Sequence, residues 1–144
     1  MLVSHILKSK PVAGVVTIKP AATLGDAAAL LSARRIGAAV VSEDGSRPGG
    51  ILSERDIVRE LVRLGPACLE RLVSDVMTRD PVTCAQGDRA VDVLQRMTDG
   101  RFRHMPVVEG GVMIGLISIG DVVKARLEEL DAERDALEGM IKGF

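Results

Sequence analysis

Aromatic residues are almost missing from this chain of 144 residues, which has no Trp, no Tyr and only two Phe, Phe102 and Phe144. Proteins that bind single-stranded nucleic acids usually stack the bases on aromatic rings, so binding of that kind is disfavoured here. The formal net charge of -1 also gives no electrostatic reason to expect a nucleic acid or an anionic membrane surface as a partner. These two deficits disfavour nucleic acids and anionic membrane surfaces as partners.

Cysteine and histidine are scarce as well. Cys68, Cys84, His5 and His104 do not follow the spacing of a metal site, so we expect two buried or half-buried thiols and no metal. No apolar run approaches the roughly 18 residues that a membrane-spanning helix needs. The amino end lacks the basic start and long apolar core of a secretion signal. We therefore expect a cytoplasmic protein with no membrane partner and no disulfide.

The most informative feature that the chain does contain is an internal repeat. Residues 49–59, GGILSERDIVR, are matched by residues 114–124, IGLISIGDVVK, and the shared Gly, Ser and Asp lie at a constant offset of 65 residues. Upstream, VSHILK at residues 3–8 corresponds to VSDVMT at residues 73–78. Two copies are too few for a solenoid, so we expect a closed pair of similar units in which any site has a pseudo-symmetric twin.

The hydrophobic patterns predict the same order of elements, β-α-β-β-α, in both copies. Thr23 is a candidate N-cap with Asp26 three residues later, and Gly65-Pro66 ends the last helix of the first copy. The first copy is predicted to contain a strand at 14–18, a helix from 24 to about 35, a hairpin of 36–41 with 50–52, and a helix at 56–64. The second is predicted to contain a strand at 81–84, a helix from 88 to about 99 with Ala90, Val91, Leu94 and Met97 inward, a hairpin of 105–108 with 112–118, and a helix from about 119.

Small sheets with helices on one face must bury the other face against a partner, and the twin unit is the obvious partner. We therefore expect an α/β (α+β) fold in which two pseudo-symmetric β-α-β-β-α units pack through their sheets. The expected boundaries are residues 1–65 for the first unit, 66–128 for the second, and 129–144 for a helical extension.

The last predicted helix continues beyond what the repeat needs. Its apolar side chains recur at steps of 4, 3, 7 and 4 residues, with Glu and Arg on the flanks. Such a stripe either packs against the protein's own core or forms a contact between two copies, and its length favours a homodimer. The stripe consists of Val123, Leu127, Leu130, Leu137 and Ile141.

Ser53-x-x-Asp56 and Ser118-x-x-Asp121 each follow a predicted strand and open a predicted helix. Taken alone, each is a capping box, in which the Ser oxygen accepts from a free backbone amide. Three further features favour a ligand. A Gly precedes the motif and permits a close approach, the free amides of a helix start suit a phosphate, and an acid one turn later accepts the hydroxyls of a ribose. Phosphate and ribose together describe a nucleotide.

The repeat resembles a tandem pair of cystathionine β-synthase (CBS) domains, the regulatory module often called a Bateman module. The resemblance covers roughly residues 2–125 and is carried by G-h-h-S-x-x-D in both copies, where h is aliphatic, with IGAAVV and RHMPVV as the strands before the hairpin turns. It implies a sensor that binds an adenosine nucleotide in the cleft between the units, with AMP first and ADP, ATP, NAD or S-adenosylmethionine as alternatives. Without Trp or Tyr, the purine pocket is expected to be walled by aliphatic side chains and backbone.

By position, the resemblance implies a role for each matching residue. One acid per copy binds ribose hydroxyls and one Ser per copy lies near phosphate, namely Asp56 with Ser53 and Asp121 with Ser118. The first-strand segments Thr17-Ile18 and Thr83-Cys84 line the base pocket. The other candidate ligand contacts are Arg55, Arg103, His104, Met105, Pro106, Ile119 and Gly120.

The two copies are not equal. The second copy carries Arg103 and His104 at positions where the first has no ionisable side chain, although these two residues are also compatible with a solvated strand edge. Between the Ser and the Asp, the first copy has Glu54 and Arg55 where the second has uncharged residues. Arg55 would attract a phosphate and Glu54 would repel it unless paired. We expect two unequal sites, with the Asp121 half better equipped.

Other functions remain as alternatives. An enzyme would need a nucleophile with a base, a P-loop or a metal cluster, and the sequence offers none of these patterns. A purely structural dimer is a further alternative, because capping alone accounts for the Ser-x-x-Asp motifs. The leading hypothesis is a non-enzymatic sensor whose nucleotide-dependent change of arrangement acts on a separate, unknown protein.

Overall fold

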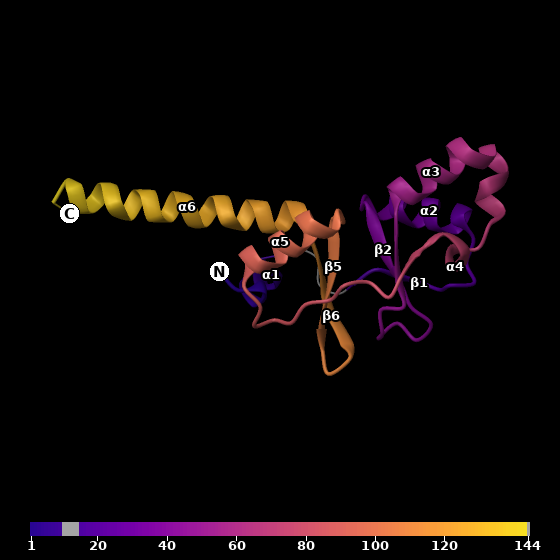
Figure 1. Ribbon diagram of the computed structural model, residues 1–144, viewed down its shortest axis with the longest axis horizontal. Coiled ribbons are helices and arrows are strands. Elements are labelled where there is room, and N and C mark those ends of the chain that lie inside the picture. Colours follow the sequence, from indigo (N-terminus) through magenta and orange to yellow (C-terminus); the bar gives the residue numbers. More distant parts are fainter. Residues whose placement is uncertain (10–14, 144) are drawn as a thin grey trace.

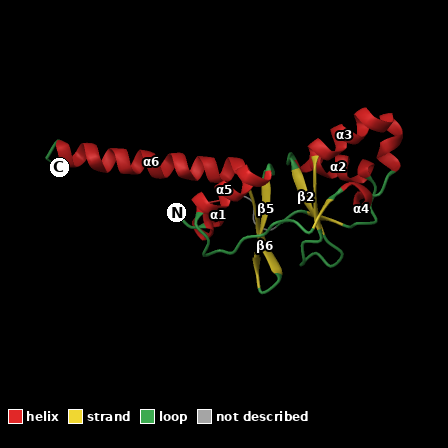
Figure 2. Ribbon diagram, in the orientation of Figure 1, coloured by secondary structure: helices red, strands yellow, loops and turns green. Residues whose placement is uncertain are grey.

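The computed structural model describes residues 1–9 and 15–143 (Figure 1). The first residue of the strand predicted at 14–18 and the aromatic Phe144 therefore lie outside the described residues. The strands lie in the middle of the molecule, in two sheets, and the helices lie on the outer flanks (Figure 2). This is the predicted mixed fold of two units packed through their sheets, so the fold class is confirmed.

The first unit follows the predicted order closely. Its α2 begins after the N-cap Thr23, whose Oγ1 accepts from the Asp26 backbone N–H at 3.1 Å while the Asp26 carboxylate accepts from the Thr23 N–H at 3.1 Å. The predicted capping box is thus confirmed. The elements are β1 (Thr17–Ile18), α2 (Leu24–Arg34), β2 (Ala38–Val41), β3 (Gly50–Ser53) and α3 (Glu54–Leu64). Strand β1 runs parallel to β2, and β2 and β3 form the antiparallel hairpin.

Between the two units the chain forms η1 (Gly65–Glu70), α4 (Val73–Val76) and β4 (Thr78–Arg79). Strand β4 was not predicted, and it extends the first sheet by pairing antiparallel with β3. The predicted strand at 81–84 is wrong. In its place only Cys84 forms a parallel bridge, to Val107. Asp80 has a positive φ of 47°, which breaks an extended chain, and Pro81 has no N–H to donate to a ladder.

The second unit contains α5 (Ala90–Gly100), β5 (His104–Glu109), β6 (Val112–Ser118) and α6 (Ile119–Ile141). The predicted hairpin and the long last helix are confirmed. Helix α5 begins two residues later than predicted, because the Asp88 carboxylate accepts from the Ala85 N–H at 2.9 Å and holds a turn before it. With that start, Val93 is buried and Val91 is 42% exposed, so the prediction that Val91 faces inward is wrong.

The short helices of the repeat are exchanged between the units. Val3 and Ile6 of α1 (Val3–Ser9) belong to the hydrophobic core of the second unit, whereas Val73 and Val76 of α4 belong to the core of the first. The exchange ties the units together because each core is incomplete without a segment from the other half of the chain. The domain boundaries expected from the sequence stay a prediction.

The Gly that opens each motif serves this exchange. A Cβ on Gly50 would lie 2.5 Å from the Met77 Sδ and 2.9 Å from the Thr78 backbone oxygen. A Cβ on Gly115 would lie 2.6 Å from the Leu7 Cδ2. The close approach that the sequence predicted at these glycines is therefore made by neighbouring protein, β4 in one unit and α1 in the other.

Helix α6 projects beyond the body of the molecule to the carboxyl end (Figure 1). Its predicted stripe does not pack on the protein's own core, since Leu127 is 58% and Leu137 59% exposed. Both cysteines are free and buried, as predicted. Among the described residues, no helix is both long enough and apolar enough to cross a membrane.

Candidate functional site

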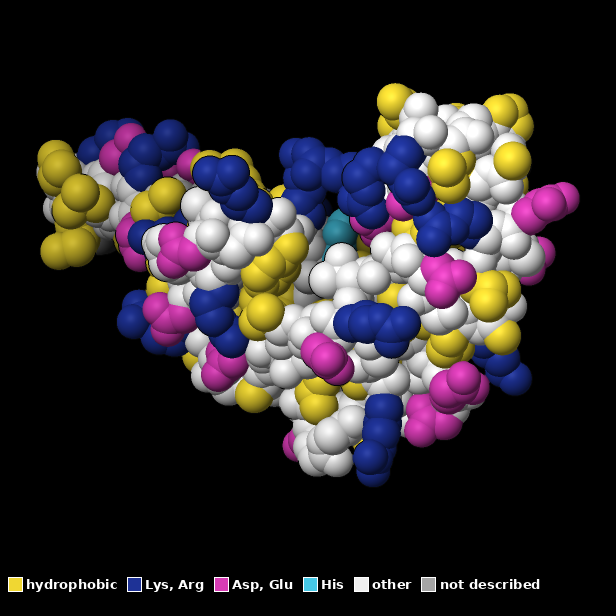
Figure 3. Space-filling model, turned by 45° about the vertical axis from the view of Figure 1, so that its right-hand side comes forward, with side chains coloured by type: hydrophobic (Ala, Val, Ile, Leu, Met, Phe, Trp, Pro, Cys, Tyr) yellow, Lys and Arg dark blue, Asp and Glu magenta, His cyan; other side chains and the backbone are white. Residues whose placement is uncertain are grey.

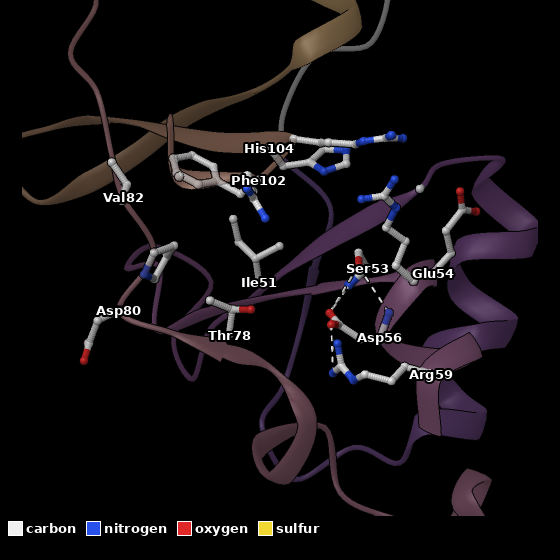
Figure 4. Close-up of a pocket in the computed structure, with 16 residues that line it drawn as sticks. Ile51, Ser53, Glu54, Asp56, Arg59, Thr78, Asp80, Val82, Phe102 and His104 are labelled. Carbon is white, nitrogen blue, oxygen red and sulfur yellow. Dashed lines mark hydrogen bonds and ion pairs between the residues drawn. The ribbon is translucent and has the colours of Figure 1, made fainter. Parts of the chain in front are cut away.

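A cleft of about 460 Å³ opens between the two units (Figure 4). Three segments line it: the start of α3, the chain that links β4 to the second unit, and the corner between α5 and β5. The described lining residues are Gly37, Ile51, Ser53, Glu54, Arg55, Asp56, Arg59, Thr78, Asp80, Pro81, Val82, Gly100, Arg101, Phe102, Arg103 and His104. Five of the residues selected from the sequence are thus brought together: Ser53, Arg55, Asp56, Arg103 and His104.

The capping box of α3 holds the acid of the cleft. The Asp56 Oδ2 accepts from the Ser53 backbone N–H at 2.9 Å and from the Ser53 hydroxyl at 3.2 Å, and the Asp56 N–H donates to the Ser53 Oγ at 3.4 Å. Only 8% of Asp56 is exposed. The carboxylate is therefore fixed in orientation by its own helix start, as the structural interpretation of the motif predicted.

Arg59 occupies the other oxygen of this carboxylate. Its Nη2 lies 3.1 Å from the Asp56 Oδ1, one turn further along α3 (Figure 4). Arg59 was not among the residues expected from the sequence, although the spacing of three residues between an acid and a base on a predicted helix was a visible signal. A ligand hydroxyl that approaches Asp56 must share Oδ1 with Arg59 or displace it.

Cations gather at the mouth of the cleft. Arg55, Arg101 and Arg103 are exposed lining residues with no ion pair inside the described chain. Figure 3 shows Lys and Arg side chains clustered beside a hollow on this face, with a histidine inside it. The Asp80 carboxylate points away from the cavity (Figure 4), whereas the Glu54 carboxylate lies beside Gly37 at its edge, so the repulsion of phosphate expected from Glu54 stays a prediction.

The other end of the cleft is apolar. Ile51, Pro81, Val82 and Phe102 line it, and Phe102 faces Ile51 and Val82 across the cavity (Figure 4). The expectation that a purine pocket would have only aliphatic and backbone walls is therefore corrected, because the ring of Phe102 also forms a wall. A Cβ on Gly100 would lie 2.4 Å from the Phe102 Cε1, so the glycine leaves the space in which the ring lies.

The comparison with protein families agrees with this arrangement. A family model described as "CBS domain" matches residues 3–63 and 73–128. The chain belongs to the CBS-domain family. It is similar to the CBS domain-containing protein CBSX3, mitochondrial, of Arabidopsis thaliana, with 35% identity over 84% of this chain and 61% of the relative. It spans about a quarter of the length of several larger Arabidopsis relatives.

Solved structures give the same result for the fold. The CBS-domain containing protein ATU1752 from Agrobacterium tumefaciens shares 43% identity with a TM-score of 0.83, covering 88% of this chain and 99% of that one. The CBS domain protein PAE2072 from Pyrobaculum aerophilum, complexed with AMP, shares 28% identity with a TM-score of 0.77, covering 92% and 99%. The neighbours therefore include CBS pairs, and one of them holds an adenosine nucleotide.

The second CBS unit repeats the capped helix start. The Asp121 Oδ2 accepts from the Ser118 N–H at 2.8 Å, and the Asp121 N–H donates to the Ser118 Oγ at 3.1 Å. Ile119 and Gly120 form the first turn of α6 after this cap. Thr17 and Ile18 lie in β1 of the first CBS unit, where Ile18 packs against the core.

The remaining selected residues belong to the second CBS unit and do not line the cleft. Cys84 and Met105 belong to its buried core, and Pro106 is buried beside them. Burial raises the pKa of the Cys84 thiol to about 11, so the thiol stays protonated and inert near neutral pH. The Thr83 carbonyl accepts from the Arg96 guanidinium at 3.1 Å. Among the described residues, no group of three or more His, Cys, Asp and Glu side chains is placed to hold a metal ion.

Proposed function

We propose that this chain is a regulatory module that binds an adenosine nucleotide in the cleft between its two CBS units. The observation that carries the proposal is the convergence of the capped start of α3, with Ser53 and Asp56, on the basic corner that contains Arg103 and His104. A CBS pair of similar fold is complexed with AMP, which supports AMP as the first ligand to test. ADP, ATP and NAD share the same adenosine half and are the alternatives.

The parts of such a ligand match three regions of the cleft. The exposed arginines beside the α3 start, Arg55, Arg101 and Arg103, suit the phosphates. The buried Asp56 carboxylate suits the ribose hydroxyls, which would take over the acceptor that Arg59 now uses. The apolar end with Ile51, Val82 and Phe102 suits the adenine ring.

The second capped helix start supplies a pseudo-symmetric twin. We propose that Ser118 and Asp121, with Ile119 and Gly120 in the first turn, contribute to a second adenosine site that also uses Thr17 and Ile18. That site lacks a counterpart of Arg55, because Gly120 occupies the equivalent position. We therefore propose that the two sites differ in affinity for phosphorylated ligands.

We propose further that the module signals rather than catalyses. A nucleotide that contacts both CBS units favours the arrangement in which both contacts form, and that preference is the basis for regulation of a separate protein. The exposed stripe on α6, centred on Leu127, Leu130 and Leu137, is proposed as the contact between two copies of the chain. The cytoplasmic location stays a prediction, and one relative is named as mitochondrial.

Isothermal titration calorimetry with AMP, ADP, ATP and NAD tests the proposal. The matched variants are Asp56→Asn and Asp121→Asn, because Asn keeps a side-chain oxygen for the cap and removes the charge. We expect Asp56→Asn to weaken binding at the cleft by about tenfold or more, since a hydrogen bond to a charged group is lost. Absence of heat with all four ligands would contradict the proposal.

A structural dimer without a ligand is the second candidate. The observation that favours it is that both carboxylate oxygens of Asp56 already have partners within the chain, namely Ser53 and Arg59. The absorption spectrum separates the two candidates cheaply. The chain has no Trp or Tyr, so the protein itself absorbs little in the near ultraviolet. A strong ultraviolet band from a compound that is released on denaturation would therefore reveal a copurified adenosine compound. A purified protein with no such band and no calorimetric response would support the structural candidate.

A further inference from the structure

Two arginines of this chain have a backbone conformation that normally favours glycine. Arg101, which follows α5, has φ 56° and ψ 42°, and Arg35, which follows α2, has φ 54° and ψ 46°. In both, the backbone N–H donates to carbonyls of the preceding turn. The left-handed conformation is unfavourable for a residue with a Cβ, and glycine is the common residue at this place after a helix. The repeat thus carries the same strained arginine in both units.

Arg101 lies at the cleft, whereas Arg35 lies elsewhere. Arg101 lines the cleft between the units next to Phe102 and Arg103. Arg35 lines a separate open groove between α2 and α3 whose walls include Leu31 and Ile57. The same backbone feature is therefore present at two places with different surroundings.

The Arg101 guanidinium makes no ion pair within the described chain, and its side chain is exposed. It lines the same cavity as the start of α3 and as Arg55. A guanidinium presents several fixed N–H donors that match the oxygens of a phosphate, and an unpaired one can make these bonds without first breaking an ion pair. Backbone strain that persists at the rim of a cavity is a reason to ask what the side chain does there.

From these observations we propose that Arg101 is a specificity-determining residue that binds the phosphate chain of the nucleotide in the Asp56 cleft. The strained turn after α5 places its guanidinium at the cleft mouth. This inference rests on the proposed function of the cleft. It states that the cleft selects phosphorylated ligands over the nucleoside. It predicts that removing the side chain weakens binding and relieves strain at the same time.

The experiment uses a reporter that sees only this cleft. Thr78 lines the cleft, is exposed and has no part in the proposed ligand contacts, and the chain has no Trp, so Thr78→Trp introduces a single fluorophore at the site. The reporter protein is titrated with adenosine, AMP, ADP and ATP, alone and with Arg101→Gly, Arg101→Lys or Arg35→Gly added. Thermal unfolding of each variant is followed by circular dichroism. Calorimetry on the unmodified chain confirms that the reporter does not create or abolish binding.

We expect Arg101→Gly to bind AMP, ADP and ATP about tenfold more weakly, because a charge-assisted contact is lost. Its affinity for adenosine stays unchanged, and its unfolding midpoint rises by about 2–4 °C. Arg35→Gly shows a similar rise of the midpoint with unchanged binding at the reporter. Arg101→Lys keeps most of the affinity for the nucleotides and gains no stability, since it retains the charge and the strain.

Two results would overturn the inference while leaving the proposed function intact. One is an Arg101→Gly protein that binds all three nucleotides as tightly as the reporter protein. The other is an equal loss for adenosine and for the nucleotides, which would indicate a structural role. A reporter protein and an unmodified chain that respond to none of the four compounds would overturn the proposed function, and the inference with it.

Discussion

Gly50→Ala provides a quantitative test of how the exchanged segments fit together. The new Cβ would lie 2.5 Å from the Met77 Sδ and 2.9 Å from the Thr78 backbone oxygen. The thioether can move, but the Thr78 oxygen belongs to β4, whose Arg79 pairs with Gly50. Ordinary contact begins at 3.4 Å, so β4 would have to retreat from β3 by about 0.5 Å.

The expected cost follows from these contacts. Overpacking of a well-packed site costs about 1–3 kcal/mol. Replacement of Gly by Ala returns about 0.5–1 kcal/mol, because the unfolded chain loses conformational freedom. We expect Gly50→Ala to lower the free energy of unfolding by about 1–2 kcal/mol. Gly115→Ala should cost less, since the atom it meets at 2.6 Å is the end of the flexible Leu7 side chain.

Urea unfolding followed by far-ultraviolet circular dichroism measures these differences. Gly139→Ala is the matched control, because its new Cβ meets nothing within 4 Å beyond its own stretch of helix, and a helical Ala is more stable than Gly by up to about 1 kcal/mol. The control should therefore be at least as stable as the original chain. A Gly50→Ala protein of undiminished stability, or a larger loss for Gly115→Ala, would refute the argument from backbone contact.

Three further predictions concern other parts of the molecule. Burial raises the pKa of the Cys84 thiol to about 11, and Cys68 is buried too. Iodoacetamide should therefore label neither cysteine in the folded protein at neutral pH and both cysteines in denaturant. Labelling of the native protein at Cys84 would contradict this. A hydrogen bond from Arg63 lowers the pKa of Glu60 below its ordinary value of 4.5. The ion pair therefore stabilises the fold above pH 4.5, and this contribution is lost as the pH falls through the folded pKa of Glu60. Glu60→Gln should flatten that part of the acid-unfolding curve, and an unchanged curve would count against the ion pair. Leu127→Glu combined with Leu137→Glu should convert a dimer to a monomer in analytical ultracentrifugation, and an unchanged sedimentation coefficient would exclude α6 as the contact.

The sequence predicted local structure well where one signal decided it. The start of α2 at Thr23 and the hairpin of β2 with β3 needed only a cap, a turn and an apolar run. The exchange of α1 and α4 could not be predicted, because each short apolar helix fits either core equally well by pattern. Val3 packs in the second core and Val73 in the first, and this choice depends on how both units pack together in the folded chain.

The candidate site shows the same division. Ser53 and Asp56 were found because the repeat marked them, and Arg103 was found because the second copy differs from the first at that position. The structure places Asp56 and Arg103 at one cleft. Arg59 was missed although it ends the repeated segment at residues 49–59, because only the Gly, Ser and Asp of that segment were compared, and Phe102 was missed because the first copy has Ile36 at that position. Their roles depend on which oxygen a helical neighbour reaches and on the space left by Gly100, which are properties of the folded chain.

The duplication and the divergence of the two copies contribute different things to the cleft. The repeated Ser-x-x-Asp gives each unit an equivalent capped helix start, and nothing in that start alone distinguishes a ligand site from a structural cap. The distinguishing charges are the unrepeated ones, and Arg55 from the first unit and Arg103 from the second line the same cavity as Asp56. The sequence favoured the Asp121 half because Arg103 and His104 belong to the second copy. Residues of one copy, however, complete the cleft of the other, so the strongest anion-binding site is expected beside Asp56.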